Sequence, residues 1–297
     1  MTCGINMIAI RIELISPTEL IIISIKMFLY NSMLVYVVLL LSVIILLMRS
    51  KRNKYDFKCF LLALKNEKGR SEKFLQSIHK KIPLEIVHGK DTRTPEKAKR
   101  FREHVDPDYY DKAVEMYHDP TVLRPDITYF NLGAIGCMMG HMKIYEKCQN
   151  QNVKYALIFE DNVVIKSNKL YDQVQSVIDE KGDDFEICFF HCLSRLPEKE
   201  EGNLEKVKWI SSTKCYLVNI PNMRWYKRFF LPMDNHIDMK HEDIISRGAR
   251  VYYKDLRNFI HIDRSHQSTI KHSDHGRTLF FSRTNPDALP KHLKHGY

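Results

Sequence analysis

Two carboxylates and an amide stand side by side after an apolar run in the stretch KYALIFEDNVVI, residues 154–165. The run predicts a buried strand, and Glu160, Asp161 and Asn162 lie at its carboxyl end. Ligands bind beyond the carboxyl ends of strands in open α/β sheets. Adjacent carboxylates repel each other, and a divalent cation that holds a diphosphate would neutralise them. A solvated turn, where Asp and Asn are common, is an equally good interpretation of this segment taken alone.

The second stretch whose residues could bind a ligand or take part in a reaction is a glycine-containing helix. NLGAIGCMMGHMKIYEKC, residues 131–148, predicts a helix on which Gly133, Gly136 and Gly140 share one face. Each glycine costs about 1 kcal/mol relative to alanine in a helix. Close approach to another backbone or to a ligand would justify that cost, and a phosphate at the helix N-terminus is one such ligand. His141 follows directly, although a lone histidine is more often structural than catalytic.

The elements around these residues predict an α/β fold with a mostly parallel sheet. Residues 56–64, 67–81 and 84–89 read as strand, helix and strand, which is a βαβ unit. The charged sequence that follows, to about residue 128, is expected to be rich in loops. Beyond the acidic strand we expect helices at 170–180 and 223–230 and strands at 185–192 and 214–220.

The N-terminal part of the chain predicts a membrane anchor. Residues 29–48 form an apolar stretch about as long as the ~20 residues that a spanning helix needs. The basic linker 49–55 follows, and the positive-inside rule then places the rest of the chain in the cytoplasm. We therefore divide the chain into an uncertain segment, an anchor, a linker, a catalytic domain and a basic tail, at residues 1–28, 29–48, 49–55, 56–272 and 273–297.

Charge and cysteine usage limit the classes of partner. The formal net charge of +10 suits a polyanionic partner such as nucleic acid, anionic lipid or a diphosphate. The basic residues are scattered and no nucleic-acid-binding motif is present, so we do not expect a nucleic-acid partner. Seven cysteines without regular spacing favour free thiols in a reducing compartment.

The order of these motifs resembles glycosyltransferase family 25, which contains lipooligosaccharide galactosyltransferases and collagen galactosyltransferases. The family's helix reads Gly-x-x-Gly-Cys-x-x-Ser-His, and its acidic strand ends Glu-Asp-Asp. Gly140 stands here at the serine position and Asn162 at the third acidic position. The segment LLALKNEKGRSEKFLQSI places Arg70 at the family's arginine position. The resemblance spans about residues 57–270.

The resemblance implies a GT-A-like nucleotide-sugar-binding domain that transfers a hexose, usually galactose. The donor would be a UDP-sugar, the acceptor a hydroxyl of a glycan, lipid or protein, and the anomeric carbon would be inverted. Mn²⁺ or Mg²⁺ would be held by Asp161 and Asn162. Donor binding would fall to Arg70, Gly133, Gly136, His141, Glu160 and Asp161.

The general base that inversion requires is sought in PMDNHIDMKHED, residues 232–243. Asp238 matches the family block best, and Asp234, Glu242 and Asp243 are further candidates. His236 and His241 in the same segment suggest zinc only weakly, because no third ligand is placed.

Two further questions stay open at this level. Asn162 and Gly140 also fit a catalytically weakened relative that acts as a membrane-anchored binding protein. The membrane side is open as well, because collagen-modifying members of the family work in a lumen.

Overall fold

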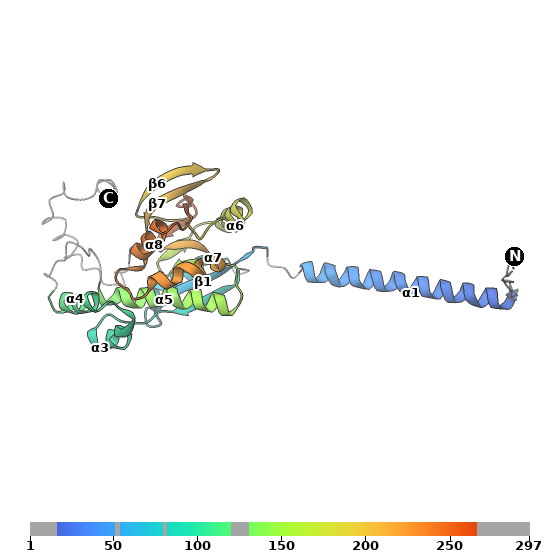
Figure 1. The fold of residues 1–297 in the computed structure, drawn as a ribbon, viewed down its shortest axis with the longest axis horizontal. Coiled ribbons are helices and arrows are strands. Elements are labelled where there is room, and N and C mark those ends of the chain that lie inside the picture. Colours follow the sequence, from blue (N-terminus) through green and yellow to red (C-terminus); the bar gives the residue numbers. More distant parts are fainter. Residues whose placement is uncertain (1–16, 51–53, 80–81, 120–130, 266–297) are drawn as a thin grey trace, which may run out of the picture. The chain divides into compact units, whose positions relative to one another are not determined.

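The computed structural model describes residues 17–50, 54–79, 82–119 and 131–265, and the chain divides into two compact units, Met1–Lys54 and Tyr55–Tyr297. The first unit contains the helix α1, Pro17–Ser50. Its window Ser24–Leu41 has a mean hydropathy of 1.7 and is long and apolar enough to cross a membrane, a test that a signal sequence also passes. The anchor expected at 29–48 lies inside this longer helix (Figure 1). The basic tail expected at 273–297 lies outside the described residues.

The second unit is built on an eight-stranded sheet (Figure 1). Apolar strands lie in the middle of the sheet, and a charged hairpin forms one edge. The strand order is β2 (Leu84–His88), β1 (Phe57–Ala63), β3 (Tyr155–Glu160), β8 (Cys215–Asn219), β5 (Ile187–Phe189), β9 (Val251–Tyr253), β7 (Leu204–Ser211) and β6 (Ser194–Glu201).

Parallel pairing is confirmed where the sequence predicted a βαβ unit. β1 and β2 are parallel and are joined through α2, Lys68–Ser77, and β3 lies parallel to β1 on its other side. The sheet as a whole is mixed, because β8 runs antiparallel to both β3 and β5, and β7 runs antiparallel to both β9 and β6. The order in which strands occur along the chain does not reveal these reversals, which depend on where each connection crosses the sheet.

Helices cover both faces of the sheet because side chains of successive strand residues point to opposite faces. Phe60 and Ile158 belong to one core cluster, with α5 (Leu132–Asn150) and α8 (Ile237–Ser246), whereas Leu61 belongs to the other. The first cluster also includes residues of α4 (Pro107–His118) and α7 (Ile220–Tyr226), and the second residues of α2 and α6 (Lys169–Lys181).

Several elements were missed in the sequence. The segment expected to be loop-rich contains the helices α3 (Pro95–Ala98), η1 (Lys99–His104) and α4. The side chain of Asp106 caps α4 by accepting hydrogen bonds from the backbone of Asp108 and Tyr109, a signal that the sequence did carry. The others are the hairpin β6–β7, the helix α8, the strand β9, and the small pair of β4 (Val163–Ile165) with β10 (Ile260–Ile262). The helix expected at 223–230 is present as the end of α7 followed by the 3-10 turn η2 (Lys227–Phe230).

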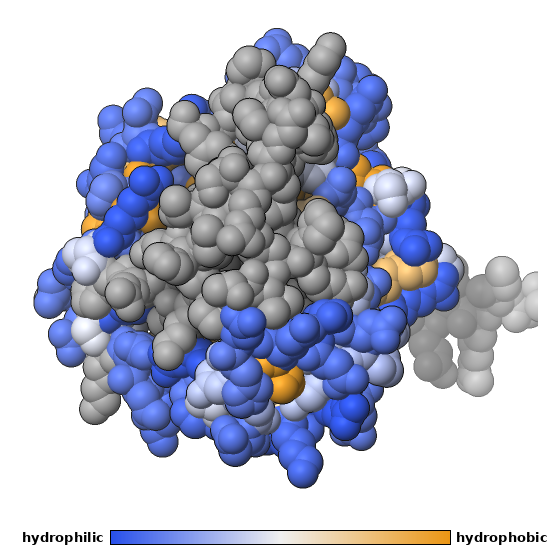
Figure 2. Space-filling view, turned by 90° about the vertical axis from the view of Figure 1, so that its left-hand side faces the viewer, coloured by the Kyte–Doolittle hydropathy of each residue, from blue (hydrophilic) through white to orange (hydrophobic). Residues whose placement is uncertain are grey.

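The surface of the described residues is mostly hydrophilic on the face that Figure 2 shows. Apolar residues are scattered over it and do not gather into a broad patch. Such scattering is normal for a domain whose large apolar side chains fill its core. The cysteines at positions 59, 137, 148, 188, 192 and 215 are free thiols, as the sequence predicted.

The glycines of α5 allow the helix to approach the sheet closely. A Cβ atom on Gly136 would lie 2.0 Å from the backbone oxygen of Lys90 and 2.7 Å from Oγ1 of Thr92. A Cβ atom on Gly140 would lie 2.6 Å from Cδ1 of Leu62. The glycine face of the helix therefore packs against β1 and the loop after β2, which settles at these two positions why glycine is present.

We expect Gly136→Ala to lower the free energy of unfolding by about 3 kcal/mol, because overpacking against a backbone atom cannot be relieved by a side-chain rotation. Gly89→Ala is the matched control, since its Cβ would make only an ordinary contact at 3.5 Å with Leu62. The measurement is the thermal unfolding midpoint of the full chain in detergent. Equal midpoints for the two variants would contradict the close approach.

Candidate functional site

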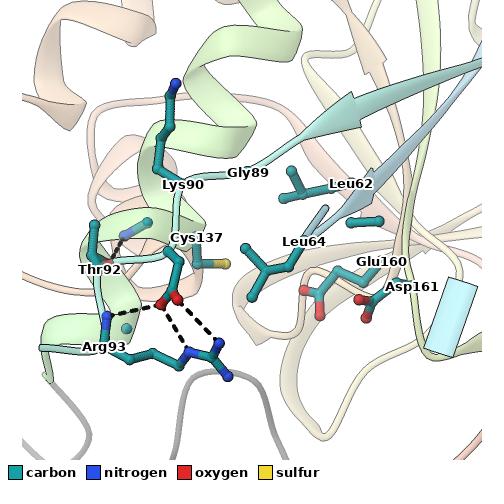
Figure 3. Close-up of a pocket in the computed structure, with 13 residues that line it drawn as sticks. Leu62, Leu64, Gly89, Lys90, Thr92, Arg93, Cys137, Glu160 and Asp161 are labelled. Carbon is teal, nitrogen blue, oxygen red and sulfur yellow. Dashed lines mark hydrogen bonds and ion pairs between the residues drawn. The ribbon is translucent and has the colours of Figure 1, made fainter. Parts of the chain in front are cut away.

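A cleft opens at the carboxyl ends of β1, β2 and β3 (Figure 3). In this position the last residues of three parallel strands meet the first turns of α5. The cleft is lined by Leu62, Ala63, Leu64, Gly89, Lys90, Asp91, Thr92, Arg93, Gly133, Gly136, Cys137, Glu160 and Asp161. The sequence-predicted residues Gly133, Gly136, Glu160 and Asp161 are thus brought to one place.

Glu160 is held by two residues that directly precede β8, Thr213 and Lys214. The Lys214 ammonium donates to Oε2 of Glu160, and the Thr213 hydroxyl donates to Oε1. Burial acts to raise the pKa of Glu160, but the nearby positive charge of Lys214 and these hydrogen bonds hold the pKa below its ordinary value. Glu160 is therefore ionised at neutral pH.

Asp161 forms a buried ion pair with Arg70 of α2. Nη2 of Arg70 lies 2.8 Å and Nε 3.0 Å from Oδ1 of Asp161, and the two side chains are only 6% and 7% exposed. Burial raises the pKa of Asp161 by more than the guanidinium lowers it. The Arg70 position that the family pattern indicated is thus explained by its contact with the acidic strand end.

Asn162 completes the acidic strand end with an unsatisfied oxygen. Its side-chain Oδ1 is buried and accepts no hydrogen bond among the described residues. Its backbone oxygen accepts a hydrogen bond from the backbone of Asp263 at 2.7 Å. A buried oxygen without a donor costs free energy, and a cation or a bound ligand would remove that cost.

The first turn of α5 forms the opposite wall of the cleft. The Asn131 side chain caps the helix by accepting from the backbone of Ala134. Thr92 Oγ1 donates to the backbone oxygen of Leu132 at 2.5 Å and accepts from the backbone of Gly136 at 2.8 Å. The loop after β2 is therefore tied to the helix on which Gly133 lies.

Two basic residues of that loop reach the cleft. Arg93 pairs with Asp91 and Glu67, whose carboxylates lie 2.8 Å and 2.9 Å from its nitrogens. Lys90 is exposed, and its ammonium forms no ion pair with any residue in the described part of the chain. Figure 3 shows Lys90 pointing away from the acidic residues and the Arg93 guanidinium turned toward its ion pair with Asp91.

His141 lies beneath the cleft and is fully buried. Its Nδ1 lies 2.6 Å from the Tyr216 hydroxyl, which in turn lies 3.1 Å from the Tyr145 hydroxyl. Burial lowers the pKa of His141 to about 4, so its imidazole is neutral at neutral pH. The family pattern suggested that His141 contacts the nucleotide-sugar donor. Because His141 is fully buried, such a contact would require the residues between His141 and the cleft to move.

The carboxylates that the sequence offered as general bases have different partners in the structure. Asp238 accepts from Nδ1 of His236 at 3.1 Å and from Ser211 at 3.4 Å. Asp234 is instead paired with Lys240, and Glu242 accepts from the Trp209 indole.

His236, which is paired with Asp238, is close enough to Glu160 for the negative charge of Glu160 to raise its pKa. Burial lowers the pKa of His236, but the negative charges of Asp238 and Glu160 outweigh burial and raise the pKa above its ordinary value. Asp234 and Asp243 are paired with Lys240 and Glu242 is bound to Trp209, whereas Asp238 is paired with the histidine on which the charge of Glu160 acts.

The two histidines considered for zinc take separate partners. Nε2 of His241 lies 3.3 Å from the Tyr145 hydroxyl, in an aromatic cage with Phe189 and Phe230, whereas His236 is paired with Asp238. The structure does not bring the two imidazoles to a common site.

Thr213, Lys214 and Arg93 are site residues that sequence reasoning missed. Lys214 is the first residue of the strand predicted at 214–220 and directly precedes the observed β8, but only the antiparallel direction of β8 places the start of that strand beside the end of β3. A lysine or threonine before a strand carries no signal of its own, so no pattern in the sequence could have identified this pair.

Comparisons with solved structures show only loose likeness. A197 from STIV matches over 73% of this chain and 98% of its own, at 9% identity and a TM-score of 0.37. A glycosyltransferase involved in the glycosylation of the major capsid of PBCV-1 matches over 75% and 98%, at 11% identity and 0.39. UDP-glucose pyrophosphorylase complexed with UDP-glucose matches over 67% and 89%, at 12% identity and 0.34. Likeness at these TM-scores carries no argument about function.

The sequence itself gives a firmer result. No curated protein matches the chain. Residues 57–262, however, match the model of "Glycosyltransferase family 25 (LPS biosynthesis protein)". The match covers more than half of the chain and runs from the first residue of β1 to the last of β10, so it includes the whole cleft. The chain therefore belongs to glycosyltransferase family 25.

Proposed function

We propose that the cleft binds a nucleotide-sugar donor and that the chain transfers a hexose, galactose in the first instance, to a hydroxyl acceptor. The observation that carries this proposal is the ion-paired acidic strand end at the cleft of a family 25 domain. The proposed fold class is GT-A, and the proposed acceptor is a hydroxyl of a glycan, a lipid or a protein.

The charges around the cleft support a diphosphate ligand. Lys90 brings to the loop after β2 a positive charge that has no ion pair among the described residues, and Arg93 beside it is shared between Asp91 and Glu67. The N-terminus of α5 faces the same cleft, although Asn131 and Thr92 already accept from two of its N–H groups. The donor diphosphate would lie between this loop and the acidic strand end, with its charge opposed by these groups.

Asp161 and Asn162 would hold Mn²⁺ or Mg²⁺. Among the described residues the buried Oδ1 of Asn162 has no hydrogen-bond donor, and hard cations take oxygen ligands, which supports this assignment. The ion, when bound, would neutralise the diphosphate as it leaves. Arg70 and Lys214 already balance the charges of Asp161 and Glu160, so both carboxylates are paired before an ion binds.

Inversion requires one group to take the proton of the acceptor hydroxyl, and we assign this role to the pair of His236 and Asp238. A carboxylate with a depressed pKa is a weak proton acceptor. Burial acts to raise the pKa of Asp238, but the charge and the hydrogen bond of the neighbouring His236 outweigh burial and hold that pKa well below its ordinary range. A histidine with a raised pKa is the better acceptor, and Asp238 then orients it and stabilises its protonated form.

The alternative is a catalytically weakened member that binds the donor without transfer. Gly140 no longer supports it, because Leu62 fills the space that a side chain at that position would need. Asn162 is the departure that still favours it. The membrane association proposed for α1, with the catalytic domain in the cytoplasm, is common to both functions.

We expect the full chain with Mn²⁺ to release nucleotide from one member of a panel of nucleotide sugars, with UDP-galactose as the first candidate. Asp161→Ala should lower that rate by about 100-fold, because it removes the metal ligand and leaves Arg70 without its partner. Asp183→Ala is the matched control, since Asp183 pairs with Lys154 at the opposite end of β3. Absence of release and of any nucleotide-induced thermal shift would refute the donor site.

Asn162→Asp should lower the Mn²⁺ concentration at half-maximal nucleotide binding by about tenfold, because it adds a negative charge to the ligand set. The measurement is the nucleotide-induced shift of the unfolding midpoint during a Mn²⁺ titration. Turnover in this variant alone, with binding but no turnover in the native chain, would identify a weakened member. An unchanged Mn²⁺ requirement would argue against Asn162 as a ligand.

Asp238→Asn should lower kcat by about 100-fold and leave nucleotide binding intact. In the native chain kcat/KM should rise with pH through a pKa above the ordinary histidine value, because the neutral form of His236 is the base. Glu242→Gln, which changes a carboxylate bound to Trp209, is the control and should keep both properties. A rate that stays constant across the histidine range would contradict this assignment.

A further inference from the structure

A cysteine, a histidine and a glutamate come together where α5 crosses the end of β3. Cys137 offers its sulfur, His141 an imidazole nitrogen and Glu160 a carboxylate oxygen, and these three atoms lie within 4.8 Å of one another. Cys137 and Glu160 line the cleft, and His141 lies fully buried behind them. Figure 3 shows the Cys137 sulfur pointing from the helix toward the strands that carry the acidic residues.

Helix geometry and the close approach of α5 explain why the three meet. Cys137 and His141 are four residues apart and so lie on the same helix face. Glu160 is two residues after Ile158 in β3, and residues two apart in a strand point to the same face of the sheet. Ile158 belongs to the core cluster that includes α5, so Glu160 points to the face that α5 covers. Gly140, which has no Cβ to clash with Leu62, lets the helix come near enough for the side chains to meet.

The unused nitrogen of His141 is an independent sign of a ligand. Nδ1 of His141 is occupied by the Tyr216 hydroxyl, whereas Nε2 is buried and has no hydrogen-bond partner among the described residues. A buried polar atom without a partner is costly, and a metal ion would remove the cost. The Tyr216 hydroxyl, itself bonded to Tyr145, would orient the ring as outer partners of metal-bound histidines do.

We propose that Cys137, His141 and Glu160 bind a divalent transition-metal ion of the zinc class. Sulfur and imidazole ligands select zinc or cobalt over magnesium and manganese, which prefer oxygen. Three protein ligands leave a fourth position open to water or to an anion in the cleft. This site is distinct from the oxygen ligands Asp161 and Asn162, and the proposal does not rest on the proposed function.

The charges at the site are compatible with such an ion. Cys137 would release its proton to solvent on binding, and its thiolate would offset one of the two positive charges. Glu160 keeps its contacts with Lys214 and Thr213, because each carboxylate oxygen can accept a second partner. Lys214 opposes the ion, so the site should bind it more weakly than a closed structural zinc site does.

Binding has a consequence for the cleft. The ion would lie at the inner wall that Cys137 and Glu160 form, beside the place proposed for the donor diphosphate. Adding Zn²⁺ when the metal required for donor binding is already present should therefore change nucleotide binding. This change should depend on Cys137.

The test is a Co²⁺ titration of the metal-free full chain in detergent, followed by the thiolate-to-cobalt charge-transfer absorption. We expect the band to saturate at one equivalent, to disappear on addition of Zn²⁺, and to be absent in Cys137→Ser. Cys192→Ser is the matched control, because Cys192 is also half-buried but contacts Arg195 and lies outside the cluster. Histidines of the C-terminal segment can bind Co²⁺ but cannot produce this band.

A second variant guards against loss of the fold. His141→Gln should weaken Co²⁺ binding by at least tenfold while circular dichroism shows the native spectrum. Absence of the band in the native chain would overturn the proposal, as would a band that persists in Cys137→Ser. Donor binding under Mn²⁺ is measured separately, so failure here leaves the proposed function standing.

Discussion

Two adjacent buried carboxylates at the end of β3 are the constraint on which the site depends. Glu160 and Asp161 would repel each other in a region that excludes water, and each is balanced by a cation from a different element. Lys214 directly precedes β8 and Arg70 comes from α2. The two ion pairs therefore hold β8 and α2 to the strand end, and they fix the two carboxylates that line the cleft.

The second requirement is a close approach of α5 to the sheet. Gly136 and Gly140 bring the helix against the Lys90 backbone and the Leu62 side chain. The same approach places the first turn of the helix beside the loop after β2, where Thr92 ties the two together. Replacing the family's serine by Gly140 thus has a steric reason in this chain, and the helix keeps its position without that hydroxyl.

The polar groups below the cleft form a connected buried layer. Tyr145 and Tyr216 link His141 to His241, and burial lowers the pKa of both histidines, so both are neutral at neutral pH. Neutral imidazoles cost less to bury than charged ones, and they leave Lys214 as the cation beside Glu160. This layer of buried tyrosines and neutral histidines therefore packs below the acidic strand end and adds no further buried positive charge.

The sequence by itself determined the family, the βαβ unit with its acidic strand end, the helix with its glycine face and the apolar N-terminal stretch, because each depends on local periodicity and on residues close together in the chain. Only the tertiary structure decided that β8 runs antiparallel, and so that Lys214 balances Glu160. It likewise distinguished Asp238, bound to His236, from the other candidate carboxylates, and it brought Cys137 and His141 near Glu160. The contacts of Glu160 with Lys214 and with α5 join residues that are distant in the sequence, and the packing of helices and strands sets them.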